Sequence, residues 1–169
     1  GSLTGMRIHH TGNTISSNIH HNIINGLHDI NTITQINPIG VVGLCYNGIN
    51  IPSSMAKISD NEIYNLTNQG ISSSANPYIK GIHFNSGNAS LFSNRIAISN
   101  SSYTNNINLT GIYKAVTNVP FSCYHNSVSI IGTSAALSKS YAFRKGSSNG
   151  TDTIKNNIFQ NTRSGAGLN

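Results

Sequence analysis

A short sequence pattern recurs five times along the chain and constrains the fold more than any other feature. The pattern consists of an apolar residue, two variable residues, Asn, one variable residue and a second apolar residue. Its copies begin at Ile19, Ile58, Leu91, Cys123 and Ile154. The starts are 39, 33, 32 and 31 residues apart, and self-similarity at a nearly constant period of this size indicates a repeat architecture.

A second marker keeps the same order and nearly the same period. The segments GLCY, GIHF and GIYK begin at Gly43, Gly81 and Gly111, and a degenerate fourth copy, YAFR, begins at Tyr141. Each repeat therefore contains a strand after Gly, a loop rich in Ser, Asn and Gly, a strand through the Asn motif, and another short apolar piece. Three short strands per repeat without a helix describe one coil of a parallel β-helix.

Composition supports a fold of many short strands and turns. The 169 residues include 26 Asn, 24 Ser and 24 Ile, while charged residues make up 8%, against about 25% in ordinary globular domains. The residues that normally cover helix surfaces are scarce, which excludes a typical helical or α/β enzyme. We expect Gly1-Ser2 to be a remnant of cloning, and residues 3–169 to form a single all-β domain of about five coils, cut from a longer repeat array.

An antiparallel β-sandwich is the alternative fold. Asn-Gly pairs at 25–26, 47–48 and 149–150 are favourable for hairpin turns. A sandwich, however, gives no reason for matched motifs at intervals of about 30 residues. The parallel β-helix is therefore the predicted fold.

The last repeats also carry a family resemblance. The segments FSCYHNSVSIIGTS and SYAFRKGSSNGTDTIKNNIFQNTRSGAG resemble the repeats of large secreted bacterial proteins with right-handed parallel β-helices of the pectin-lyase-like class, over roughly residues 40–169. The resemblance implies a right-handed coil and a secreted or cell-surface location. Because pectin-lyase-like folds often carry polysaccharide lyases or hydrolases, a carbohydrate-active enzyme is one hypothesis for the function.

The repeated Asn is predicted to be structural. The chain must turn sharply between two strands of a coil, and Asn tolerates the left-handed conformation better than any residue except Gly. Stacked copies can also pass side-chain amide hydrogen bonds from coil to coil. The predicted column comprises Asn22, Asn61, Asn94, Asn126 and Asn157.

Candidate catalytic residues are scarce. Glycoside hydrolysis normally needs two facing carboxyl groups, and only Asp60 and Glu62 lie close together in the sequence. No acid occupies the aligned positions of the other repeats, and four scattered acids cannot supply an oxygen-rich calcium site. The sequence therefore favours a non-catalytic module, with a polysaccharide lyase or glycoside hydrolase as the alternative.

No metal or cofactor site is predicted. The adjacent pairs His9-His10 and His20-His21 can each present only one ligand to a given face, because neighbouring strand residues point to opposite sides. Cys45 and Cys123 have apolar or aromatic neighbours and are expected to be buried, unpaired thiols.

The feature most like a binding surface is a column of side chains in the second marker. His83, Tyr113 and Phe143 follow one another at 30-residue intervals, and Lys114 and Arg144 stand one residue after the last two. An outward column would stack its rings about 4.8 Å apart into a strip suited to sugar rings, with the bases nearby for acidic glycans. An inward column would be core packing. The charges of Lys114 and Arg144 indicate that at least these members of the neighbouring column face solvent. The sequence leaves both arrangements open.

These observations, with the resemblance, predict a structural or adhesive module of a secreted or cell-surface bacterial protein that binds polysaccharide weakly, especially acidic glycans. The net charge of +6 reflects few acids and scattered bases, so nucleic acid is not a predicted partner. No apolar stretch reaches the roughly 18 residues of a membrane helix, so no membrane span is predicted. The open ends of the stack are expected to associate end to end.

Overall fold

The computed structural model describes residues 2–11, 17–30, 34–35, 40–49, 55–72, 75–100, 106–115, 119–134, 138–146 and 150–165. Within these ranges the chain forms strands, turns and bends, and no helix.

Three large parallel sheets, named A, B and C, make up the body of the molecule. Sheet A contains, in spatial order, β1 (Ser2–His9), β6 (Gly40–Asn47), β11 (Tyr78–Ser86), β14 (Asn108–Lys114) and β17 (Ser140–Lys145). Sheet B contains β2 (Asn18–His20), β7 (Met55–Ser59), β12 (Asn88–Phe92), β15 (Phe121–Tyr124) and β18 (Asp152–Lys155). Sheet C contains β3 (Ile23–Asn25), β8 (Glu62–Tyr64), β13 (Arg95–Asn100), β16 (Ser127–Ser134) and β19 (Ile158–Asn161), and β20 (Ser164–Gly165) also pairs with β16.

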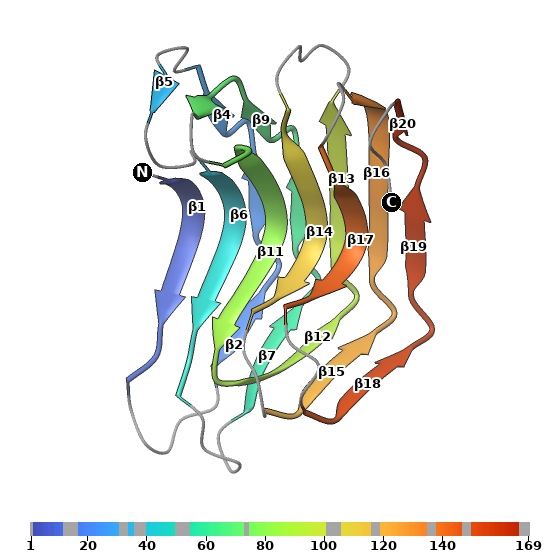
Figure 1. Cartoon of the computed structure of the whole chain (residues 1–169). Helices are drawn as coiled ribbons and strands as arrows, with labels where there is room; N and C mark the ends of the chain where they lie inside the picture. Colours follow the sequence, from blue (N-terminus) through green and yellow to red (C-terminus); the bar gives the residue numbers. More distant parts are fainter. Residues whose placement is uncertain are drawn as a thin grey trace.

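The chain visits sheets A, B and C in this order five times, which defines coils 1 to 5. Coils 1 and 2 are longer, and their extra residues form two small parallel pairs. These pairs join β4 (His28–Asp29) to β9 (Thr67–Asn68), and β5 (Thr34–Gln35) to β10 (Ile71–Ser72). In Figure 1 the chain descends through sheet A on the near side, returns through sheets B and C on the far side, and advances from left to right, which is a right-handed path.

The fold predicted from the repeats is therefore confirmed as a right-handed parallel β-helix of five coils. The strand pairs of the described residues are all parallel, so the antiparallel sandwich is wrong. The strands of coils 1 and 5 in the three large sheets pair with a neighbour on one side only. End-to-end association of two copies stays a prediction.

A ladder of Asn side chains runs through all five coils at the turn between sheets B and C. Asn94 shows its geometry: the side-chain Nδ2 and the backbone N–H both donate to Asn126 Oδ1, at 2.8 and 3.0 Å. Nδ2 of Asn94 also donates to the carbonyl oxygen of Ile58 in the preceding coil, at 2.8 Å. The same two-donor contact links Asn22 to Asn61, Asn61 to Asn94, and Asn126 to Asn157.

The left-handed residue at this turn is the one before each Asn, which corrects the expectation that Asn itself takes this conformation. The φ angles are 56° at His21, 53° at Asp60, 56° at Ser93, 55° at His125 and 54° at Asn156. All five of these side chains are exposed, so their identity varies freely. The Asn side chain is constrained instead by its hydrogen bonds, because a buried amide must satisfy its donors and acceptor.

In the interior face of sheet A, two aromatic side chains are followed in register by a lysine. Tyr46 and Phe84 stack with ring centres 5.6 Å apart, and Phe84 pairs in register with Lys114 on the next coil. Lys114 is fully buried, which corrects the expectation that it faces solvent. Its Nζ donates to the carbonyl oxygen of Val119 at 2.9 Å and forms an ion pair with the carboxylate of Asp152.

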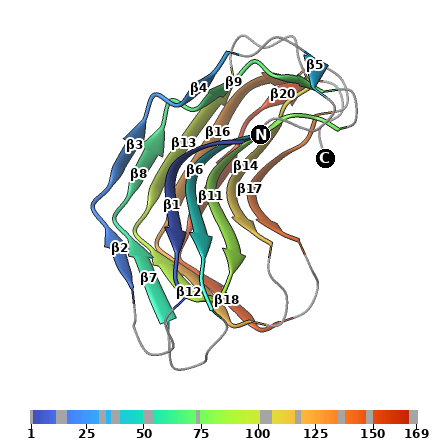
Figure 2. The same cartoon turned by 90° about the vertical axis from the view of Figure 1, so that its left-hand side faces the viewer.

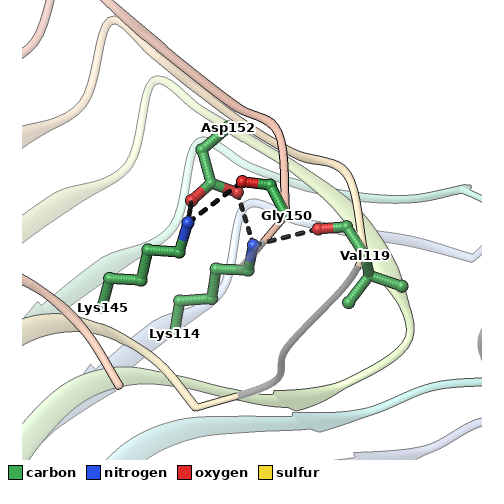
Figure 3. A network of polar contacts seen from close by, with 5 residues as sticks. All are labelled: Lys114, Val119, Lys145, Gly150 and Asp152. Carbon is green, nitrogen blue, oxygen red and sulfur yellow. Dashed lines mark hydrogen bonds and ion pairs between the residues drawn. The ribbon is translucent and has the colours of Figure 1, made fainter. Parts of the chain in front are cut away.

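Asp152 serves two lysines at once (Figure 3). Its Oδ1 pairs with Lys114, and its Oδ2 lies 2.8 Å from Lys145 Nζ, which also donates to the carbonyl oxygen of Gly150 at 3.1 Å. Burying an ammonium is tolerable only when a counter-charge and further hydrogen bonds accompany it. This cluster therefore joins the end of β17 and the start of β18 in coil 5 to the core of coil 4.

Replacing a ladder Asn in the middle of the stack is expected to destabilise the protein far more than replacing one at its end. Asn94→Ala strips partners from the Asn61 N–H, the Ile58 carbonyl and Asn126 Oδ1, and should lower the free energy of unfolding by about 3 kcal/mol or more. Asn22→Ala removes fewer, more exposed contacts and should cost about 1 kcal/mol. Urea unfolding followed by circular dichroism measures both, and equal losses would contradict the ladder's role.

The buried cluster predicts an asymmetric pair of variants. Asp152→Ala leaves Lys114 without its counter-charge and should lower the free energy of unfolding by about 3–5 kcal/mol. Lys114→Met keeps an apolar side chain of similar length in an apolar column and should stay within about 1 kcal/mol of the parent protein. The same urea experiment on the double variant checks the mechanism, because Asp152→Ala should cost much less once Lys114 is methionine.

Candidate functional site

The strands of sheet A bend sharply, and the bend makes their outer face concave. Figure 2 shows β6, β11 and β14 curving so that the hollow side faces away from sheets B and C. We place the bend at Gly43, Gly81 and Gly111, which lie within these strands. In β11 the alternation of burial breaks there, because Gly81 and Ile82 are both buried. A Cβ on Gly81 would lie 2.5 Å from Ile96 Cγ2 of sheet C and 2.6 Å from the carbonyl oxygen of Gly111. In coils 2 to 4 only Gly allows sheet A to approach sheet C this closely, which explains the Gly of the second marker.

The register of sheet A shows which marker residues share a column. His83 pairs with Tyr113, and Tyr113 pairs with Arg144. The other outward members of the column are Arg7 and Cys45 in coils 1 and 2. His83, Tyr113 and Arg144 of the predicted strip are therefore brought together on the outer face.

Phe143 does not belong to this column, contrary to the sequence-based alignment. It pairs with Ile112, packs against the core and lies between two interior rings, with centres 6.1 Å from Phe121 and 5.9 Å from Phe159. The alignment is off by one residue because Ala142, between Tyr141 and Phe143, takes the place that Gly111 holds in coil 4. Lys114, one residue after Tyr113, points inward to Asp152 and also leaves the strip.

Cations and tyrosine rings alternate across coils 3 to 5 on the concave face. Lys80 Nζ lies 4.4 Å from the ring centre of Tyr78 and 4.3 Å from that of Tyr113. The Arg144 guanidinium lies 5.4 Å from the centre of Tyr113 and 5.1 Å from that of Tyr141. We call this set, together with His83, the cation–aromatic face. His83 closes it on one side, with its ring centre 5.1 Å from that of Tyr113.

The electrostatics of this face are set by burial and by like charges. Burial and, to a smaller extent, the charge of Arg144 lower the pKa of Lys80 to about 8, with Cys45 opposing them. Burial, with a smaller contribution from Lys80, lowers the pKa of His83 to about 4. At neutral pH the face therefore carries charge on Lys80 and Arg144, while His83 is neutral. Its buried Nε2 has no hydrogen-bond partner among the described residues.

The carboxylates that form ion pairs in the described ranges do so elsewhere. Glu62 pairs with Arg95 at 2.8 Å on the outer face of sheet C, and Asp152 pairs with Lys114 and Lys145. Neither Lys80 nor Arg144 takes part in these pairs. The concave face therefore has two cations whose charge is stabilised by ring faces rather than by acids, which suits an anionic ligand.

The other sequence candidates do not converge on one site. Asp60 occupies the left-handed position of the turn before Asn61, and Glu62 is engaged by Arg95. His20 Nδ1 and His21 Nδ1 lie 2.6 Å apart on the exposed surface of coil 1. In the described ranges no group of three or more His, Cys, Asp or Glu side chains is arranged to hold a metal ion. Cys45 and Cys123 are buried and unpaired.

Sequence reasoning missed Tyr78, Lys80 and Tyr141. Strict alternation places residues three apart on opposite faces of a strand, so Lys80 and His83 are not expected together. The bend at Gly81 resets the alternation and turns both side chains outward. One sequence signal could have predicted them: Tyr78 and Lys80 lie two residues apart, directly before the marker residue Gly81.

Comparison with known proteins adds no assignment. No family model matches the chain, and neither the curated proteins nor the solved structures contain a significant match. The part of the chain that the structure describes contains no helix long and apolar enough to cross a membrane.

The pKa of Lys80 gives a direct test of this geometry. In protein labelled with ¹³C at lysine Cε, the Lys80 resonance should titrate with a midpoint near pH 8, well below the ordinary lysine pKa of 10.5. Arg144→Gln removes the repelling charge and should raise the midpoint only in part, because burial is the larger cause. A Lys80 midpoint at the ordinary lysine value of 10.5 would contradict the described packing.

Proposed function

We propose that this chain is a non-catalytic structural or adhesive β-helix module of a secreted or cell-surface protein, and that its cation–aromatic face holds acidic polysaccharide. The single observation that carries the proposal is the concave face itself, where Lys80 and Arg144 lie among three tyrosines and neither cation is paired with a carboxylate of the described residues. The resemblance of the last repeats to pectin-lyase-like surface proteins supports the bacterial, extracellular part of the proposal.

The arrangement favours recognition of charge over stacking on sugar rings. The Tyr113 ring already contacts Lys80 of coil 3 and Arg144 of coil 5, so it is not free to stack on a sugar ring. An incoming carboxylate or sulfate gains charge-assisted hydrogen bonds from the guanidinium and the ammonium, and the guanidinium can bind it with two parallel bonds. Tyrosine hydroxyls supply further donors and acceptors for ring hydroxyls. Uronic-acid chains present both groups on every residue and therefore fit the face.

A stack of coils suits this role mechanically. Each coil contacts only its neighbours, so coils can be added without changing the fold, and a spacer or surface array needs that property. The pairing of Glu62 with Arg95 supports the non-catalytic part, since it leaves the predicted acid pair with one member already neutralised. A carbohydrate-active enzyme is the alternative, and turnover of pectate or alginate that disappears in an Asp60→Ala, Glu62→Ala double variant would establish it.

Binding of an acidic oligosaccharide should depend on salt and on the protonation of Lys80. Isothermal titration with alginate or pectate hexamers should show affinity falling as salt rises from about 50 to 500 mM, because screening shortens the range of exposed charges. The Lys80 pKa of about 8 lies below its ordinary value, so the cation is present at pH 6–7 and is lost as pH rises above 8. Affinity should fall over that interval.

Variants separate this mechanism from general attraction to a basic protein. Lys80→Gln should bind about tenfold more weakly at pH 7 and lose the pH dependence, whereas Lys80→Arg should keep the affinity and also lose the pH dependence. Lys57→Gln, which removes an equal charge from exposed sheet B, is the matched control and should bind like the parent protein. Equal losses in Lys57→Gln and Lys80→Gln would refute the assigned face.

A further inference from the structure

A second hollow lies on the outer face of sheet C, separated from the cation–aromatic face by the body of the molecule. It has a volume of about 460 Å³ and is lined by side chains of three successive coils: Glu62 and Tyr64, Arg95 and Ala97, and Ser127 and Ser129. Figure 2 shows sheets A and C on opposite sides of the stack, so a ligand in one hollow does not touch the other. We call this hollow the sheet C trough.

The register of sheet C explains the shape of the trough. Tyr64, Ala97 and Ser129 form one outward row, and Glu62, Arg95 and Ser127 form the next. In both rows a large side chain in coil 2 is followed by a serine in coil 4, and a larger side chain, Ile158 or Gln160, follows in coil 5. The serines therefore mark the low part of the surface. A volume of this size falls within the range of about 300–1,000 Å³ that is typical of small-ligand sites.

The lining groups are complementary to an uncharged polar molecule. Glu62 can only accept hydrogen bonds and Arg95 can only donate them, and their ion pair at 2.8 Å leaves the site without net charge. Ser127 and Ser129 do both, and the Tyr64 ring, 37% exposed, gives a flat apolar wall. The ion pair is largely exposed, so it is weak and a ligand displaces it at little cost.

We propose that the sheet C trough binds an uncharged saccharide unit. Adjacent ring hydroxyls donate to the Glu62 carboxylate and accept from the Arg95 guanidinium, which matches one acceptor-only group beside one donor-only group. The C–H face of the sugar covers the Tyr64 ring, and the ring edge lies over Ala97, where a larger side chain would block it. This inference rests on sheet C alone and does not depend on the function proposed for sheet A.

The test is NMR titration of isotope-labelled protein with maltohexaose, cellohexaose and mannohexaose, each at about 10 mM, which is above a millimolar Kd. At least one probe should shift the signals of Tyr64, Ala97, Ser127 and Ser129, and the shifts should persist in 500 mM salt because no net charge is involved. No shift at these residues with any of the three probes overturns the proposal.

Two surface variants identify the site. Ala97→Arg fills the exposed floor and Tyr64→Ala removes the wall, and each should abolish the shifts while circular dichroism shows an unchanged fold. Tyr141→Ala on sheet A is the matched control and should keep neutral-sugar binding. Binding that survives both sheet C variants overturns the proposal. Binding of acidic oligosaccharide to sheet A should be unaffected by Ala97→Arg, so failure of one site is distinguishable from failure of the other.

Discussion

In-register stacking of the coils is the constraint on which the rest of this molecule depends, and the Asn ladder enforces it. In each coil the backbone N–H and the side-chain amide of one Asn converge on a single oxygen of the next, so a slipped coil would lose two buried hydrogen bonds together. Register matters because a shift by one residue turns every inward side chain outward. With the turn between sheets B and C held, the extra residues of coils 1 and 2 are accommodated in the small pairs β4–β9 and β5–β10.

The bend at the marker glycines is the second constraint, and it produces the chemistry of the concave face. Because Gly81 has no side chain, sheet A can approach Ile96 of sheet C, and the strand changes direction there. The change brings Lys80 to the same side as His83. Burial is the larger cause that lowers both pKa values there, with a further lowering of Lys80 by Arg144 and of His83 by Lys80. The chain has only four acidic residues, and on this face Lys80 contacts the rings of Tyr78 and Tyr113 rather than a carboxylate.

A parallel stack turns each outward position into a column, so the chemistry of a face is decided coil by coil. On sheet A the column runs through Arg7, Cys45, His83, Tyr113 and Arg144, which accumulates positive charge and rings. On sheet C the same stacking places an ion pair beside small side chains and leaves a neutral trough. Two faces of one repeat can therefore have ligands of different charge without any change in the backbone between them.

The sequence by itself determined the parallel β-helix and its number of coils, because the Asn motif recurs at a spacing that only stacked coils explain. It also predicted the five ladder residues, because an Asn that is needed at the same turn of every coil recurs once per repeat in the sequence. The tertiary structure alone decided which side chains lie on the concave face. The bend at Gly81 breaks two-residue alternation and turns Lys80 outward, the offset at Ala142 sends Phe143 into the core, and Asp152, from a different sheet, makes it possible to bury Lys114. Each of these side-chain directions depends on contacts between coils or between sheets. The alternation of residues within one strand cannot predict such contacts.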